Sequence, residues 1–141
     1  MTIALVGHCG PDMYMLRSAV RQALPDFEIV SINDEETLRG QTGSDSLLLV
    51  NRVLDGDFST SSGIALMTHL ASKGEAPRWM LISNFPEAHQ EAMTRGALPG
   101  FGKSSAYARE TRGILQRAVG ETPNLPELSP QDGVENDTGR S

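Results

Sequence analysis

Residues 47–51 read Leu47-Leu48-Leu49-Val50-Asn51, and this run is the strongest strand signal in the chain. A continuous apolar run of this length predicts a strand whose two faces are both buried. Such strands are typical of parallel sheets that carry helices on both faces. We therefore expect short apolar strands to alternate with amphipathic helices on both sides of this run.

Strand and helix patterns do alternate over the rest of the chain. Besides the run above, strands are predicted at residues 3–6, 27–32, 79–82 and 100–102. The second of these alternates in polarity, as is typical of a strand at a sheet edge. The helical patterns occupy residues 11–24, 33–39, 63–73, 86–95 and 104–118, the last with Ser104-Ser105 as its cap. Five strands alternating with five helices predict an α/β fold, an open parallel sheet covered on both sides.

The chain of 141 residues is long enough for one domain, which we place at residues 1–119. Residues 120–141 are acidic and rich in proline, and we expect them to form a disordered tail because they cannot bury enough apolar surface. The formal net charge is −6, and no concentrated basic face is visible, which argues against nucleic-acid binding.

Other features of the composition point to a cytoplasmic protein. No run approaches the roughly 18 apolar residues of a membrane helix, so we expect no membrane association. The first residues lack a basic leader and a signal-type cleavage site. The single cysteine, Cys9, rules out an internal disulfide and agrees with a reducing compartment.

Polar residues follow several of the predicted strands. Ligand sites of open parallel sheets lie at the carboxyl ends of the strands, where the strand order reverses. The candidate site residues at these ends are His8, Cys9, Asn51, Arg52, Ser83, Asn84 and Lys103.

Three stretches, taken in order, resemble the receiver domains of bacterial response regulators. Residues 96–104 read Gly-Ala-Leu-Pro-Gly-Phe-Gly-Lys-Ser, similar to the receiver motif in which Gly-Ala precedes a short strand and an invariant lysine. Residues 48–51, followed by Asp55-Gly56, resemble the third strand and the loop after it, and residues 79–83 resemble the fourth strand with its terminal serine. The resemblance covers residues 2–119. It implies a flavodoxin-like, CheY-like three-layer fold, with five parallel strands in the order 2-1-3-4-5 and five helices.

The receiver resemblance fails at the residues that carry phosphorylation. The acidic pair that holds Mg²⁺ in receivers falls on Gly7-His8 or His8-Cys9, and neither offers a carboxylate. Asn51 occupies the position of the phosphoacceptor aspartate of receivers, and a neutral amide is a poor nucleophile toward phosphorus. We therefore expect a pseudo-receiver without metal or cofactor. Asp12 is interpreted as a helix-starting residue, and Asp55 and Asp57 as residues of a solvated turn; Asp55 as a substitute phosphoacceptor is the alternative.

Lys103 and Ser83 stand where receiver residues contact the phosphoryl group. With no aspartate to face, Lys103 is expected to donate to the Asn51 side-chain oxygen or to backbone carbonyls. The alternative is that Lys103 and Arg52 hold a small anion in a remodelled pocket.

The stretch Gly7-His8-Cys9-Gly10 is unusual and supports three specific hypotheses. These are a transition-metal site, a reactive thiol at a helix N-terminus and an anion site. The favoured interpretation is a rearranged loop that fills space left by the acidic pocket. Adjacent His8 and Cys9 on extended chain would point to opposite faces, so we predict no catalytic Cys-His pair and no enzyme.

The sequence therefore predicts a signalling module that acts through protein–protein contact without phosphorylation. The partner is an unidentified protein or a second copy of the chain. Receivers commonly use the face formed by the fourth helix, fifth strand and fifth helix, which here carries Arg95, Phe101, Tyr107, Arg109 and Arg112. The competing interpretation is that Phe101 and Tyr107 are core and that the arginines are merely solvated. A small-anion or metal sensor, and an unorthodox phosphorylated receiver, are the alternative functions.

Overall fold

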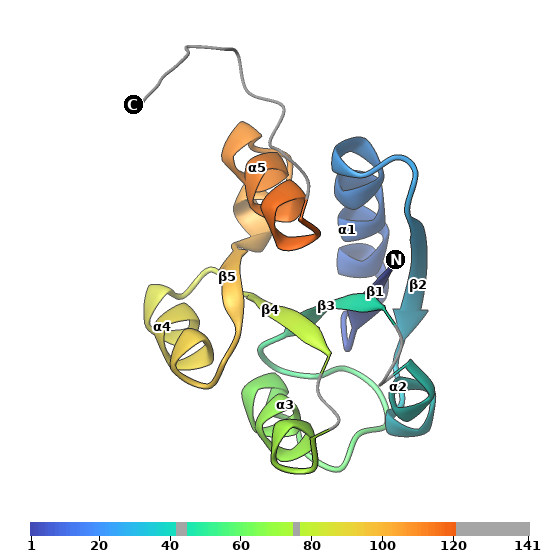
Figure 1. Cartoon of the computed structure of the whole chain (residues 1–141), viewed down its shortest axis with the longest axis vertical. Helices are drawn as coiled ribbons and strands as arrows, with labels where there is room; N and C mark the ends of the chain where they lie inside the picture. The colour runs from blue at the N-terminus through green and yellow to red at the C-terminus, as the bar shows by residue number, and fades with distance from the viewer. Residues whose placement is uncertain (42–44, 75–76, 121–141) are drawn as a thin grey trace.

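The computed structural model describes residues 1–41, 45–74 and 77–120, and the tail predicted at residues 120–141 lies outside them apart from Gly120. A five-stranded parallel sheet runs through the molecule in the order β2-β1-β3-β4-β5 (Figure 1). The predicted strand order and the five helices are confirmed. The elements are β1 (Thr2–Val6), α1 (Gly10–Ala23), β2 (Glu28–Ile32), α2 (Glu35–Gln41), β3 (Ser46–Asn51), α3 (Gly63–Ser72), β4 (Arg78–Ile82), α4 (Pro86–Thr94), β5 (Leu98–Phe101) and α5 (Arg109–Ala118).

The central strand β3 is buried along its whole length, as its apolar run predicts. It pairs with β1 on one side and β4 on the other, for example Leu48 with Ala4 and with Trp79. β2 is an edge strand, as predicted, and it is more exposed than β3, although its exposure does not alternate strictly along the strand. The sheet therefore has a dry centre and two more polar edges.

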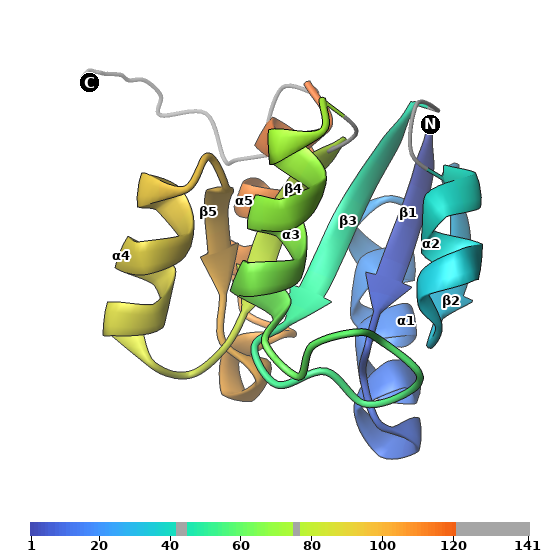
Figure 2. The same ribbon diagram turned by 90° about the horizontal axis from the view of Figure 1, so that it is seen from below.

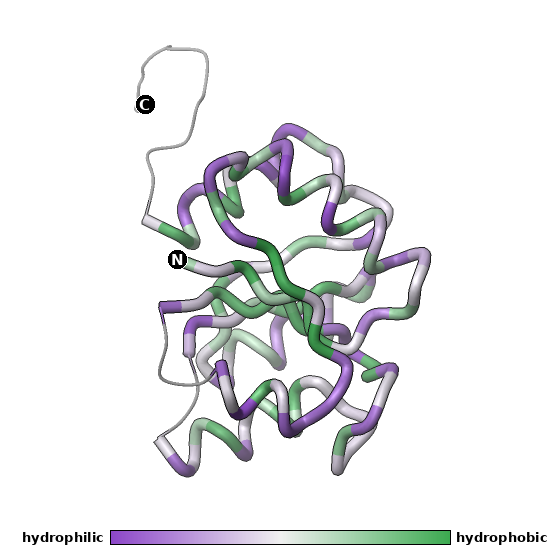
Figure 3. Tube along the Cα trace, turned by 90° about the vertical axis from the view of Figure 1, so that its right-hand side faces the viewer, coloured by the Kyte–Doolittle hydropathy of each residue, from purple (hydrophilic) through white to green (hydrophobic). Residues whose placement is uncertain are grey.

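Helices cover both faces of the sheet, with α1 and α5 on one face and α2, α3 and α4 on the other (Figures 1 and 2). Successive side chains of a strand point to opposite faces, so β3 contributes to two separate cores. Leu47 and Leu49 pack toward α1 and α5, whereas Leu48 and Val50 pack toward the other helices. Figure 3 shows apolar strands running between helices that are more polar on the outside.

The segment after β4 differs from the prediction in two places. β5 spans Leu98–Phe101 and is not confined to residues 100–102. Ser104 and Ser105 do not cap α5, because they belong to a short 3-10 turn, Lys103–Ser105. The helix begins at Arg109, after a cap residue, Ala108, that has no side-chain hydrogen bond.

The loop between β3 and α3 extends across to the end of β2 and the start of α2 (Figure 2). Asp34 and Asp57 form an isolated parallel bridge there. The Asn33 side-chain amide donates to the carbonyls of His8 and Asp55, at 3.2 and 3.1 Å. Leu54 of the same loop is buried. The loop is therefore tied to the sheet beside the carboxyl end of β1.

Candidate functional site

The carboxyl ends of β3 and β4 and the 3-10 turn that follows β5 surround a small cavity of about 220 Å³. Among the predicted site residues, Asn51, Arg52, Ser83 and Lys103 line it together, with Asn84 beside them. His8 and Cys9 do not line this cavity. The structure therefore brings together five of the seven candidate residues at the strand ends, all except His8 and Cys9.

Asn51 is part of the framework of the site. Its side chain is almost fully buried, and its Nδ2 donates to the Gly7 carbonyl at 2.9 Å. The backbone amide of Asp55 donates to the same carbonyl, also at 2.9 Å. Asn51 thus joins the end of β3 to the end of β1, an interaction that a carboxylate, which is an acceptor only, cannot make.

Lys103 pairs with Asp12 at the start of α1, with 2.7 Å between Nζ and Oδ2. The expectation that Lys103 donates to Asn51 or to backbone carbonyls is wrong, because a carboxylate from α1 is within reach. The interpretation of Asp12 as only a helix-starting residue is incomplete for the same reason. The hydrogen bond from Lys103 lowers the pKa of Asp12 below its ordinary value, so this carboxyl is ionised near neutral pH.

His8 is buried beneath the end of the sheet, with 1% of its surface exposed. Its Nε2–H donates to the Leu49 carbonyl at 2.8 Å, since that carbonyl can only accept. Burial lowers the pKa of His8 to about 4, so the ring is neutral near pH 7. No described residue donates to Nδ1. This supports the interpretation of His8 as a residue of a rearranged, packed loop.

Cys9 lies at the N-cap of α1 and is partly exposed, without a side-chain cap to the helix. A hydrogen bond from its thiol is one of the smaller causes that lower the pKa of Asp12. No group of three histidine, cysteine or acidic side chains is arranged to hold a metal ion within the described part of the chain. The transition-metal hypothesis thus gains no support from the geometry.

Ser83 and Arg52 are engaged in local contacts at the cavity. The Ser83 hydroxyl accepts from the backbone amide of Phe85 at 3.1 Å. The Arg52 guanidinium stacks on the Phe85 ring, 4.8 Å from its centroid. His89 of α4 donates to the Ser83 carbonyl at 2.6 Å. The cavity wall is therefore built largely from the turn between β4 and α4.

Asn84 and Asp12 have structural roles at the site that the sequence pattern does not indicate. The Asn84 side-chain oxygen accepts from both the amide and the hydroxyl of Ser104, at 3.1 Å each, and so fixes the turn after β5. Asp12 pairs with Lys103, which is 91 positions away in the sequence. No local motif marks either role; only the predicted meeting of strand ends places Asn84 near Lys103.

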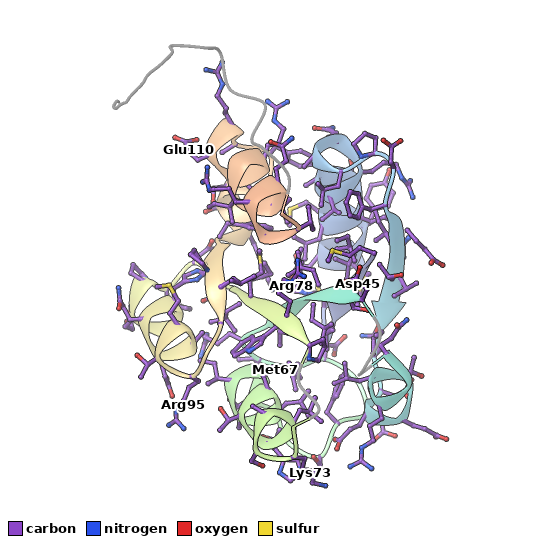
Figure 4. All side chains as sticks on the ribbon, in the orientation of Figure 1. Asp45, Met67, Lys73, Arg78, Arg95 and Glu110 are labelled. Carbon is purple, nitrogen blue, oxygen red and sulfur yellow. The ribbon has the colours of Figure 1, made fainter. Side chains whose placement is uncertain are left out.

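The predicted interaction face is only partly exposed. Phe101 belongs to the core, whereas Tyr107 is half exposed, so the competing interpretation is right for Phe101. Arg95, Arg109 and Arg112 are all exposed. Figure 4 shows Arg95 at the end of α4, far from Glu110 in the first turn of α5, so the arginines do not form one cluster.

Between α4 and α5 lies a groove of about 770 Å³ over β5, which includes Gln90, Gly100 and Ala108.

No helix among the described residues is long and apolar enough to cross a membrane. Asp55 and Asp57 are exposed in the loop after β3. Their backbone groups bond to Gly7 and Asn33, which agrees with the predicted turn.

Comparison with protein-family models finds no match, and no curated protein matches the sequence. Solved structures of response regulators do share the fold. A receiver domain from Rhodospirillum rubrum has a TM-score of 0.60 at 15% identity, covering 90% of this chain and 100% of the other. A receiver protein from Pseudoalteromonas atlantica has a TM-score of 0.61 at 20% identity, covering 84% and 97%.

The response regulator RcsB of Salmonella typhimurium, solved in a study of its DNA interaction, has a TM-score of 0.63 at 16% identity. The match covers 89% of this chain but only 62% of RcsB, so this chain spans less than two thirds of that protein. At these identities the likeness establishes the fold. This chain has the fold of response-regulator receiver domains.

Proposed function

We propose that the chain is a receiver-like regulatory module that acts through protein–protein contact and is not controlled by phosphorylation of its third strand. The ion pair between Lys103 and Asp12 carries this proposal. Asp12 neutralises the charge of Lys103, so the lysine has an anionic partner even though β3 carries no carboxylate at position 51. The module is proposed to have no catalytic activity and to need no cofactor.

The state of Asn51 supports the same proposal. Its amide is committed to the Gly7 carbonyl in a nearly closed environment. An amide in this position has no negative oxygen to attack phosphorus and gives Mg²⁺ no charged ligand. The site is then a fixed structural joint between β1, β3 and the segment after β5.

Phosphoryl transfer to the purified protein tests this proposal. The chain is incubated with Mg²⁺ and acetyl phosphate, and its intact mass is measured. We expect no phosphoryl addition, and no shift of the amide signals of Asn51, Ser83 and Lys103 with beryllium fluoride. A phosphoryl adduct would reject the proposal, and its loss in Asp55→Asn would identify Asp55 as the acceptor.

The groove between α4 and α5 is the proposed contact surface for a protein partner. It is large enough for several side chains and exposes the edge strand β5, whose free backbone groups can pair with another chain. Self-association is the form of this contact that the purified chain can test. Light scattering after size-exclusion chromatography should show a dimer that Gln90→Arg weakens and Gln22→Arg, an equally exposed change on α1, does not. A strict monomer at all concentrations would exclude the homodimer.

The anion-sensor alternative has less support. Of the two cations at the cavity, Lys103 is already neutralised by Asp12, and Arg52 stacks on Phe85. We therefore retain the protein-contact function as the one that the geometry favours.

A further inference from the structure

A second hollow lies on the opposite side of α4 from the groove described above. It has a volume of about 610 Å³ and is bounded by the loop after β3, the start of α3 and one side of α4. Its apolar lining is formed by Val53, Ile64, Phe85 and Ala88, and we call it the α3–α4 hollow. Pro86, His89 and Gln90 face the other groove, so the two surfaces use different sides of the same helix.

Two large apolar side chains at this hollow remain in contact with water. Val53 is 53% exposed and Phe85 is 51% exposed. Arg52 stacks on the Phe85 ring and helps to hold it beside the hollow. Exposed apolar side chains gathered at one concave surface are typical of a binding site for another molecule.

The rim of the α3–α4 hollow carries an unbalanced negative charge. Glu87 and Glu91 line it from α4, one helical turn apart, and both are exposed. Neither forms an ion pair with any residue of the described ranges. Glu87 lies in the first turn of α4, where the helix dipole favours a carboxylate, but Glu91 lies one turn further along and adds a like charge without that benefit. Arg52 supplies a single opposing charge at the hollow.

The combination of an apolar floor and two adjacent carboxylates defines the chemistry of the occupant. From it we infer that the α3–α4 hollow binds a basic amphipathic segment of a partner protein, which places an apolar side chain in the hollow and lysine or arginine against Glu87 and Glu91. A helix with basic residues at positions i and i+4 matches the spacing of the two glutamates. An acidic segment or a nucleic acid would face both carboxylates and is disfavoured.

This surface is independent of the proposed contact through the groove between α4 and α5, and either proposal can fail without the other. The probe is a synthetic helical peptide with leucines on one face and lysines at i and i+4. A control peptide carries glutamate in place of each lysine. Binding is measured by fluorescence anisotropy, and its location by amide chemical shifts of the labelled protein.

We expect the basic peptide to bind and to shift signals of Val53, Ile64, Phe85 and Ala88, while the acidic peptide does not. The double variant Glu87→Lys/Glu91→Lys should weaken binding by about tenfold or more. The variant Glu28→Lys/Glu36→Lys makes the same charge change on β2 and α2 and should weaken it by less than about twofold. Phe85→Ser should weaken binding while both glutamates remain.

Several results would overturn the inference. These are no binding of the basic peptide, equal losses in the two double variants, preferential binding of the acidic peptide, or shifts confined to other surfaces. Self-association that is lost in Glu87→Lys/Glu91→Lys would instead assign the hollow to a second copy of the chain. Amide spectra of all variants without peptide show whether the fold is retained.

Discussion

Asp12 and Lys103 are separated by 91 positions in the sequence, and their ion pair joins the first turn of α1 to the segment after β5. Asp12→Asn should reduce the free energy of unfolding by about 0.5–1 kcal/mol at pH 7, a small value because both side chains are partly exposed. The pKa of Asp12 is lowered in the folded state, so its contribution is present above the ordinary value of 3.8 and is lost as pH falls through the folded pKa.

Urea unfolding of the wild type and Asp12→Asn at several pH values checks this prediction. The difference between them should be full at pH 7 and should vanish once the wild-type carboxyl is protonated. Glu28→Gln, an exposed carboxylate without an ion pair in the described ranges, should have almost no effect. A difference that persists unchanged in acid would show that the ion pair is not its cause.

His8 should make the fold sensitive to moderate acid. Burial lowers its pKa from 6.5 to about 4, so between these values the unfolded chain binds a proton that the folded chain does not. Stability is therefore lost as pH falls through this window, by an amount on the order of 3 kcal/mol. His8→Gln removes the titrating group and should flatten the decline, even though it lowers stability at pH 7.

The slope of stability against pH is the measurement that matters for His8, because it is separate from any loss of packing. Urea midpoints at intervals between pH 7 and pH 4 give this slope for both proteins. His69→Gln, at an exposed position on α3, is the control. Parallel curves for the wild type and His8→Gln would contradict the assignment of a buried, neutral ring.

At the scale of elements, Gly56 limits how the loop after β3 can fold. Its φ is +124°, and a Cβ at this position would collide with the Asn33 carbonyl oxygen. Gly56→Ala should lower the free energy of unfolding by about 2 kcal/mol or more, because strain and collision add. Gly74 also has a positive φ, +70°, but has open space around it. Gly74→Ala should therefore lower the free energy of unfolding by only about 1 kcal/mol. Urea unfolding compares the two, and equal losses would show that the collision is relieved.

The elements that could be predicted are those with strong patterns of their own. The run at residues 47–50 and the amphipathic helix after Pro11 needed no tertiary information. β5 was misplaced because Pro99 and Gly100 weaken its pattern, and only pairing with β4 defines its ends. The start of α5 was placed too early because serine is a good cap in general, whereas here Ser105 turns back to accept from Thr111 through its carbonyl.

The predicted site was right about which strand ends meet and incomplete about which side chains pair. The rule for parallel sheets places Asn51, Ser83 and Lys103 together without further knowledge. The partner of Lys103 could not be chosen in advance, because the angle at which α1 leaves the sheet decides whether Asp12 reaches it. The orientation of His8 toward the interior has the same origin in the path of the chain after Gly7.

At the scale of the whole molecule, the position of each strand should set its resistance to local opening. β3 is buried and paired on both sides, whereas β5 is short, irregular and paired on one side. Native-state hydrogen exchange should therefore show β3 amides opening only with global unfolding. Amides of β5 and α2 should exchange at least about tenfold faster. Uniform protection across all five strands would indicate a molecule that opens only as one unit.

Arg78, the first residue of β4, donates to the carbonyl of Ala118 at the end of α5, at 2.9 Å. The described chain therefore ends beside the amino-terminal ends of the strands, where β1 also starts. The cavity and the Asp12–Lys103 pair lie at the carboxyl ends of the strands. A dye or a sensor-chip linkage introduced at Thr2 or Gly120 would thus leave the carboxyl ends of the strands facing away from the attachment point. Immobilised protein can then be screened against candidate partners with that end of the sheet accessible.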